Sequence, residues 1–328
     1  MTYIGIYISE KGIAVITDSQ ASTDKEKDDF CQKLYTIGGN FVTGTGLGVV
    51  IQETAKGLER MVGNSIVSPE ELAQLALKIG LKTYDFSDPR AETHIHVSGR
   101  HDGLVKGGNG RGDFRIYAVV LAYESGIADA GKVLFDGSGS ASVAEALERD
   151  LQKGIIPFIH RDLDDMLGFL YDTGMEAPES PGVNMEFQFG FSDGNNIAAV
   201  YDPNVDVILP PKMRAGKKFR EHDDPMANKA DFNELVGLLR QRYALRARYN
   251  EANESLLYGE NGHDIERIKR EYDGAKRKTI KYVSRMIDAE PMAISSRQDD
   301  KQNGKTIKID VKEALFMAHS STIFSHKG

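Results

Sequence analysis

The chain opens with MTYIGIYISEKGIAVITD, residues 1–18, and this stretch decides the fold. Isoleucine occupies every second position from 4 to 8, which is the two-residue period of a β-strand. Glu10-Lys11-Gly12 then separates this run from a second apolar run at residues 13–16. Two such runs around a short turn that contains glycine predict a β-hairpin. The hairpin begins at residue 2, so the first residues are expected inside a sheet and not in a loose tail.

Beyond the hairpin, blocks of strands alternate with pairs of helices up to about residue 205. Ser68-Pro69-Glu70-Glu71 is a capping-box helix start with proline at the first helical position. From the spacing of apolar residues we expect strands at 33–37 and 40–45, helices at 51–62 and 68–79, strands at 94–97, 116–123 and 133–136, helices at 143–151 and 163–170, and strands at 185–191 and 197–201. Paired helices between blocks of antiparallel strands predict an α+β sandwich with helices on both outer faces, and not a parallel sheet built from βαβ units.

The character of the sequence changes after Pro210-Pro211. Apolar residues at three-four spacing, from Phe232 to Tyr243 and from Ile265 to Met286, predict two helices that form an antiparallel helical hairpin. The apolar stripe is narrow and partly polar, so the hairpin is expected to pack on the main domain or on a partner. We therefore predict a main domain at residues 1–210 and a helical appendage with a tail at residues 211–328.

The composition is that of a globular protein, with 40% hydrophobic and 27% charged residues in 328. The start of the chain lacks a secretory signal and no segment approaches a membrane span, so we expect a cytoplasmic protein without membrane contact. The single cysteine, Cys31, excludes an intramolecular disulfide. Residues 212–288 hold 18 Lys/Arg and 13 Asp/Glu, so this region carries +5 and the rest −13 of the net −8. The signs alternate along the expected helices, which favours a solvated face over nucleic-acid binding.

Three short segments carry the candidate chemistry. Thr2 begins the first strand, Asp18 stands in the stretch TDSQAS after the second strand, and Lys33 opens the stretch KLY of the third. Together with GTGL at residues 44–47 and FDGSGS at residues 135–140, these segments resemble the proteasome β-subunits and the bacterial proteasome-related peptidase. The resemblance implies an N-terminal nucleophile (Ntn) hydrolase with a four-layer αββα sandwich of antiparallel sheets, to which the C-terminal helical hairpin is an addition.

Thr2 has a physical reason to be the nucleophile. A threonine hydroxyl attacks poorly unless a base takes its proton, and a free α-amine, with an ordinary pKa of about 7.7 to 8.0, suits that role at neutral pH. Thr2 gains such an amine only if Met1 is removed, which the small threonine side chain should permit. By resemblance, Lys33 favours the deprotonated forms of its neighbours, while Asp18 holds Lys33 charged and oriented.

The resemblance assigns three further residues to the site. Ser138 matches the family serine that hydrogen-bonds near the α-amine. The backbone N–H of Gly46 is expected to bind the oxyanion, although the alignment can slip to Gly48. Ser180 is placed as the family's later serine, but Ala177 stands where its aspartate partner is expected, with glutamates one and two positions away. The sequence departs from the family pattern there, which affects the fine-tuning of the site and not the nucleophile.

The resemblance, which extends over about residues 2–205, implies a threonine-type peptidase that acts on peptides or proteins through an ester intermediate, without a cofactor or metal. A homo-oligomer is expected, but not a standard barrel. Three alternatives stay open. The ester can pass to an amine, as in the proteasome-related connectases; the chain can be an inactive scaffold, although the helix that precedes the first strand in α-type subunits is missing; or the basic helical hairpin can serve as an interaction module.

Other groups of residues give weaker indications of a binding site. The glycine-rich stretches at residues 44–48 and 137–140 precede helices, but neither completes a nucleotide-binding fingerprint. His94, His96 and His101 could converge on a metal, yet their alternation on a strand favours ordinary surface histidines.

Overall fold

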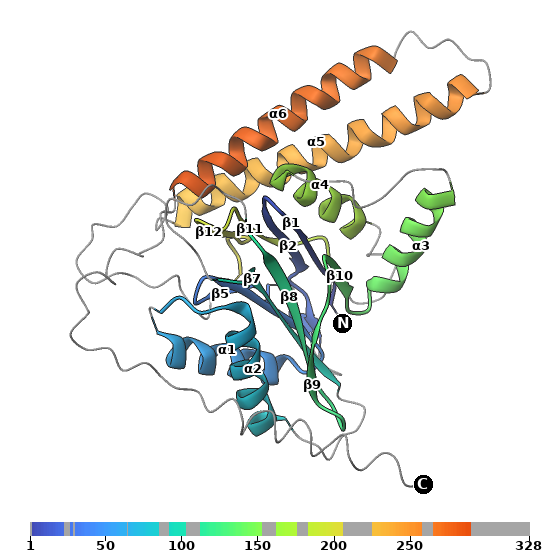
Figure 1. Cartoon of the computed structure of the whole chain (residues 1–328). Coiled ribbons are helices and arrows are strands. Elements are labelled where there is room, and N and C mark those ends of the chain that lie inside the picture. The colour runs from blue at the N-terminus through green and yellow to red at the C-terminus, as the bar shows by residue number, and fades with distance from the viewer. Residues whose placement is uncertain are drawn as a thin grey trace, which may run out of the picture.

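The computed structural model describes residues 2–22, 27–28, 30–63, 65–84, 92–102, 112–152, 162–175, 183–205, 225–257 and 265–289. Across these residues the chain is a mixed α+β protein with two five-stranded antiparallel sheets, a separate two-stranded ribbon and several helices (Figure 1). The α+β class expected from the sequence is therefore confirmed. None of the described helices has the length and apolar character needed to cross a membrane.

The first sheet contains the N-terminal strand near its middle, in the order β10-β1-β2-β11-β12. Its strands are β1 (Ile4–Ser9), β2 (Gly12–Asp18), β10 (Val133–Asp136), β11 (Phe187–Ser192) and β12 (Ile197–Val200). The predicted hairpin is present, because β1 pairs with β2 and places Ile4 opposite Thr17. On its other side β1 pairs with β10, and Ile4 lies opposite Asp136. The start of the chain is thus held between two neighbouring strands.

The second sheet has the order β5-β6-β7-β8-β9. Its strands are β5 (Tyr35–Ile37), β6 (Asn40–Thr45), β7 (Thr93–Arg100), β8 (Phe114–Leu121) and β9 (Gly126–Asp129), and the ribbon consists of β3 (Ala21–Ser22) and β4 (Lys27–Asp28). One expectation was wrong here, and one strand was missed. β5 begins at Tyr35, so Lys33 lies in the segment before the strand. β9 was not predicted, because this short, partly exposed strand carries no apolar alternation.

The two sheets pack face to face through apolar side chains. Ile6 and Val15 of the first sheet meet Phe41 and Ile116 of the second in one buried cluster. The outer face of the second sheet is covered by α1 (Gly48–Val62) and α2 (Pro69–Thr83). The predicted capping box opens α2: Ser68 Oγ accepts a hydrogen bond from Glu71 N at 3.2 Å, and Glu71 Oε2 accepts one from Ser68 N at 3.1 Å.

The outer face of the first sheet is covered by helices that follow β10 in the chain (Figure 1). These are α3 (Ser140–Gln152), α4 (Leu163–Gly174), α5 (Pro225–Leu257) and α6 (Ile265–Ala289). Helices α5 and α6 lie side by side across α4, and Tyr282 OH on α6 donates a hydrogen bond to the carbonyl oxygen of Asp231 on α5 at 2.8 Å. Phe232 and Leu235 of α5 share a core with Phe189 of β11. The expected boundary at residues 210 and 211 lies outside the described residues, so the division into domains stays a prediction.

Candidate active site

The β1–β2 hairpin brings Asp18 next to the start of the chain. Asp18 is the last residue of β2, and its backbone N–H donates to the carbonyl oxygen of Tyr3 at 3.1 Å. In return, the Tyr3 N–H donates to Asp18 Oδ1 at 2.8 Å, and the Gln20 N–H donates to Asp18 Oδ2 at 3.2 Å. The Asp18 side chain is fully buried and fixed by these backbone donors. Its carboxylate therefore sits beside the residue that follows Thr2.

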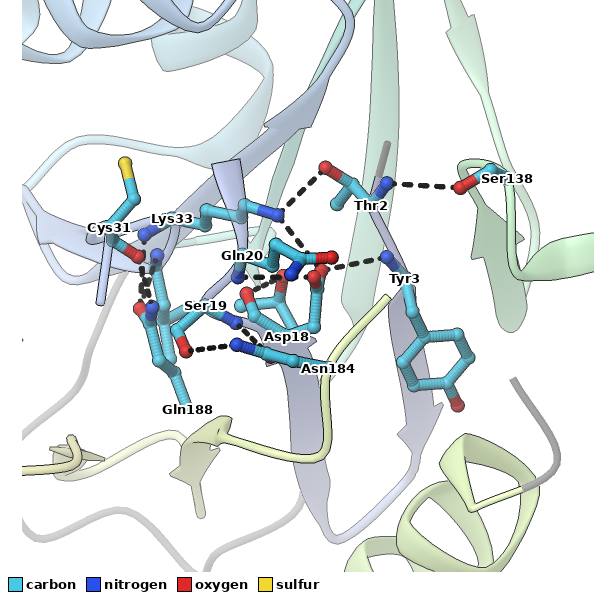
Figure 2. Close-up of polar contacts among 12 residues, drawn as sticks. Thr2, Tyr3, Asp18, Ser19, Gln20, Cys31, Lys33, Ser138, Asn184 and Gln188 are labelled. Carbon is cyan, nitrogen blue, oxygen red and sulfur yellow. Dashed lines mark hydrogen bonds and ion pairs between the residues drawn. The ribbon is translucent and has the colours of Figure 1, made fainter. Parts of the chain in front are cut away.

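Lys33 joins this carboxylate to the Thr2 hydroxyl. Its Nζ donates to Thr2 Oγ1 at 2.9 Å and to Asp18 Oδ1 at 3.0 Å (Figure 2). Thr2 is 7% exposed and Lys33 8%. The three residues come from three separate segments of the sequence, and the structure brings all of them together. In this arrangement a buried ammonium faces the hydroxyl oxygen, where it can stabilise negative charge that develops on that oxygen.

Gln188 on β11 holds the Lys33 segment in place. Its Oε1 accepts hydrogen bonds from the backbone N–H groups of Lys33 and Leu34, both at 3.0 Å, and its Nε2 donates to the Cys31 carbonyl oxygen at 2.7 Å (Figure 2). Gln188 is fully buried. One amide thus satisfies three backbone groups of a segment that lies outside the sheets. Gln188 was not predicted from the sequence; a polar side chain within the Phe-rich alternation of β11 was the available signal.

Ser138 stands on the other side of Thr2. The Thr2 nitrogen donates to Ser138 Oγ at 3.2 Å, and Gly139 N donates to the Thr2 carbonyl oxygen at 3.4 Å. Gly137 has a φ of +92°, and a Cβ at this position would lie 2.0 Å from the Thr2 carbonyl oxygen. Only glycine allows the loop to approach the chain start so closely. The structure thus places Ser138 next to Thr2, and its role in the site stays a prediction.

Gly46 lies at the end of β6, where the chain turns into α1. Its φ is +100°, and an added Cβ would lie 2.4 Å from the carbonyl oxygen of Glu92. Gly48 is the first residue of α1, and an added Cβ there meets nothing within 4 Å. Of the two glycines considered for the oxyanion, Gly46 is the one whose backbone conformation requires glycine. Its assignment as the oxyanion donor stays a prediction.

Ser180 and Ala177 lie outside the described residues, so the assignment of Ser180 stays a prediction. The described segment that follows contributes Asn184. Its Oδ1 accepts from the Ser19 N–H and its Nδ2 donates to Ser19 Oγ, both at 3.3 Å. Figure 2 shows this amide on the Asp18 side of the site. Sequence reasoning missed Asn184, because nothing in its local pattern distinguishes it from a loop residue.

Burial governs the electrostatics of the site. Burial lowers the pKa of Lys33, and the negative charge of Asp18 opposes that shift. Burial also raises the pKa of Asp18, whereas Lys33 and the backbone donors from Tyr3 and Gln20 act in the opposite direction. A lysine with a lowered pKa can exchange a proton nearer neutral pH than an exposed lysine. The Thr2 hydroxyl, the Lys33 amine and the Asp18 carboxylate thus form one chain of hydrogen bonds.

A second polar cluster lies close to the same loops. His94 and His96 of β7 contact Asp136, the residue before Gly137, and these three form a group of side chains within the described residues that could hold a metal ion. The expectation of surface histidines is wrong for His96, which is 2% exposed because it faces the other sheet. It holds for His101, which is exposed at the end of β7.

Hydrogen bonds set the charges in this second cluster. Asp136 and Glu92 accept hydrogen bonds from His94 and raise its pKa to about 9, although burial acts against the shift. Burial acts to raise the pKa of Asp136, but hydrogen bonds from His94 and His96 outweigh it and hold that pKa well below its ordinary value.

No protein-family model matches the sequence, and a search of curated proteins gives no match either. The functional assignment of the site therefore depends on its own residues.

Proposed function

We propose that the chain is a threonine-type Ntn amidohydrolase that cleaves peptide bonds through an ester on Thr2. One observation carries this proposal: Lys33 Nζ donates to Thr2 Oγ1 at 2.9 Å while it is also bonded to the buried Asp18. The two packed antiparallel sheets with outer helices support the four-layer αββα fold of that family, and helices α5 and α6 support the predicted C-terminal hairpin.

In the proposed reaction, removal of Met1 turns the Thr2 nitrogen into a free amine. This amine takes the proton of the Thr2 hydroxyl as Oγ1 attacks the amide carbon of the substrate, and it returns the proton to the leaving amine. Ser138 Oγ, which accepts a hydrogen bond from the Thr2 nitrogen at 3.2 Å, orients the amine. Lys33 stabilises charge on Oγ1, and the N–H of Gly46 stabilises the oxyanion. Water then hydrolyses the ester and frees Thr2.

The proposal is tested by intact-mass measurement of the purified protein before and after exposure to a peptide epoxyketone, which requires a hydroxyl and a free α-amine on the same residue. We expect the wild-type protein to lack Met1 and to gain one adduct. Thr2→Ser should keep the adduct, whereas Thr2→Ala should lose it. Thr83→Ala, at an exposed threonine at the end of α2, is the matched control and should react like the wild type.

The outcome also separates the alternatives. Retention of Met1 together with no adduct on the wild-type protein overturns the enzymatic proposal and leaves a scaffold or an interaction module. If the adduct forms, incubation with a peptide library in the presence of an amine-bearing second peptide tests the fate of the ester. Hydrolysed products support the peptidase, and joined peptides support a ligase.

A further inference from the structure

The His94–His96–Asp136 cluster joins the two sheets. His94 and His96 lie two residues apart on β7, so their side chains share one face of the second sheet. Asp136 is the last residue of β10 in the first sheet. Its Oδ2 lies 2.9 Å from His94 Nδ1 and 2.6 Å from His96 Nε2. One ligand atom from each of the three residues falls within 4.8 Å of the others.

The Asp136 carboxylate is crowded by donors. Besides the two imidazole nitrogens, Oδ2 accepts a hydrogen bond from Thr45 Oγ1 at 2.9 Å. Its other oxygen, Oδ1, accepts the backbone N–H of Gly137 at 2.6 Å. A carboxylate has about four lone-pair sites over its two oxygens, so three donors on Oδ2 crowd that one oxygen. The crowding disappears if a cation takes the place of the two imidazole protons, because the nitrogens then offer lone pairs to the cation.

The second ring nitrogen of His94 contacts a carboxylate, as is typical of a histidine that binds a metal. This nitrogen, Nε2, lies 2.8 Å from Glu92 Oε1. A histidine that binds a metal through one nitrogen commonly donates its other N–H to a carboxylate, which fixes the tautomer and the ring orientation. Packing fixes the ring of His96 as well, since only 2% of this residue is exposed.

We propose that His94 Nδ1, His96 Nε2 and Asp136 Oδ2 bind one divalent transition-metal ion of the Zn²⁺ type. Two imidazole nitrogens and one carboxylate oxygen are ligands that Zn²⁺ accepts readily, and three protein ligands leave a fourth position open. Mg²⁺ and Ca²⁺ fit less well, because both prefer a shell made of oxygen atoms. The site is distinct from Thr2, Lys33 and Asp18, so it does not depend on the proposed peptidase activity.

The position of the ion gives it a role in organising the loops around Thr2. Asp136 directly precedes Gly137 and Ser138, which contact the Thr2 backbone. Thr45, which bonds to the same Asp136 oxygen, directly precedes Gly46. A bound ion would therefore link the loop of Gly137 and Ser138 to the turn at Gly46 through the Asp136 carboxylate. Its removal should loosen both segments.

The test measures metal binding and needs no catalysis. Thr2→Ala protein, freed of metal by dialysis against a chelator, is titrated with Zn²⁺ by calorimetry and with Co²⁺ by visible absorption. We expect one saturable Zn²⁺ site per chain and the absorption bands of a four-coordinate Co²⁺ complex. His94→Ala and Asp136→Asn should abolish both signals. His101→Ala, the matched control at an exposed histidine directly after the last residue of β7, should bind like the parent.

A further variant keeps the test informative if the ligand variants do not fold. Glu92→Gln changes an exposed side chain and should weaken Zn²⁺ binding by about 10- to 100-fold. Melting curves of the metal-free proteins establish which variants are folded. The proposal is overturned if the metal-free parent shows no saturable Zn²⁺ binding, or if the folded His94→Ala, Asp136→Asn and Glu92→Gln proteins all bind Zn²⁺ as tightly as the parent does.

Discussion

Lys33 Nζ donates a hydrogen bond to Thr2 Oγ1 at 2.9 Å across 31 residues of sequence. The contact depends on two separate structural features. The β1–β2 hairpin fixes the start of the chain, and Gln188 fixes the Lys33 segment. A lysine so placed has lost most of its hydration and retains the neighbouring Asp18 as its counter-ion. The proposed chemistry therefore depends on a charge that is costly to bury and difficult to replace.

Lys33→Ala is expected to slow epoxyketone labelling of Thr2 by about 10² to 10⁴-fold, since it removes a group proposed to assist proton transfer at Oγ1. Lys33→Arg should not rescue the rate, because the guanidinium is larger, planar and always charged. Labelling followed by mass spectrometry measures the rate. Unchanged labelling of Lys33→Ala would exclude Lys33 from the reaction.

A stability effect accompanies the loss of Lys33, because removal of one partner leaves the Asp18 carboxylate buried without its counter-ion. The double variant Lys33→Met/Asp18→Asn should recover much of the melting temperature that Lys33→Met loses, while it remains slow in labelling. Equal stability of the single and double variants would mean that the ion pair contributes little to folding.

Gly46→Ala should impair the site, whereas Gly48→Ala should not. Gly46 has a φ of +100° and no space for a Cβ beside the Glu92 carbonyl oxygen, so the substitution must move the turn after β6. We expect loss of about 1 to 3 kcal/mol of stability and slower labelling. At Gly48, in the first turn of α1, alanine meets no atom and suits the helix. Similar behaviour of the two variants would remove Gly46 from the proposed oxyanion site.

Gln188→Leu should uncouple the Lys33 segment from β11. The substitution keeps the approximate volume but leaves two backbone N–H groups and one carbonyl oxygen without the amide. Unpaired buried groups predict a loss of about 3 kcal/mol in the free energy of unfolding. The half-buried Asn184 provides a control, since Asn184→Leu should cost less. Chemical denaturation measures both, and equal losses would contradict the assigned role of Gln188.

Replacing Asp164 on α4 is expected to stabilise the protein by an amount that depends on pH. Burial, with smaller contributions from the charges of Asp165 and Asp162, raises the pKa of Asp164 from the ordinary 3.8 to about 6, whereas Arg242 and Lys276 act in the opposite direction. A carboxyl whose pKa is raised in the folded state stabilises the fold below pH 3.8, and that contribution is lost as the pH rises through 6. Asp164→Asn should therefore raise the free energy of unfolding by about 1 to 2 kcal/mol at pH 8 and change it little at pH 4.

The neighbouring residue gives the opposite expectation, which makes it a useful control. Asp165 contacts Lys276 at 2.6 Å and Arg242 at 3.3 Å, so Asp165→Asn removes two ion pairs and should lower the melting temperature at pH 8. Melting curves of both variants between pH 4 and pH 8 measure the difference. A melting temperature of Asp164→Asn that tracks the wild type at every pH would contradict the raised pKa.

Local patterns predicted local structure well. The alternation of isoleucines predicted the β1–β2 hairpin, and the Ser68 capping box predicted the start of α2, because both depend on neighbouring residues. The meeting of Thr2, Asp18 and Lys33 did not follow from periodicity. It was predicted from a resemblance to a family, and the structure brings the three side chains together.

Contacts between distant segments were missed for a common physical reason. Gln188 and Asn184 serve backbone or side-chain groups more than 150 residues away, and no local pattern encodes such pairing. His96 was expected at the surface because a strand presents alternate faces, but sequence alone does not say which face meets a second sheet. Ser180 lies outside the described residues and stays a prediction.

The strand order β10-β1-β2-β11 has a consequence for synthesis on the ribosome. Thr2, the proposed nucleophile, is translated long before β10 and β11, the strands with which β1 and β2 pair. At typical translation rates the chain up to Gln188 takes about 10 to 40 s to make. During that interval the N-terminus is accessible to a methionine-removing enzyme while Lys33 has no fixed position. If Met1 is removed as proposed, its removal can thus precede assembly of the site, and the proposed activity requires that most of the chain has been translated.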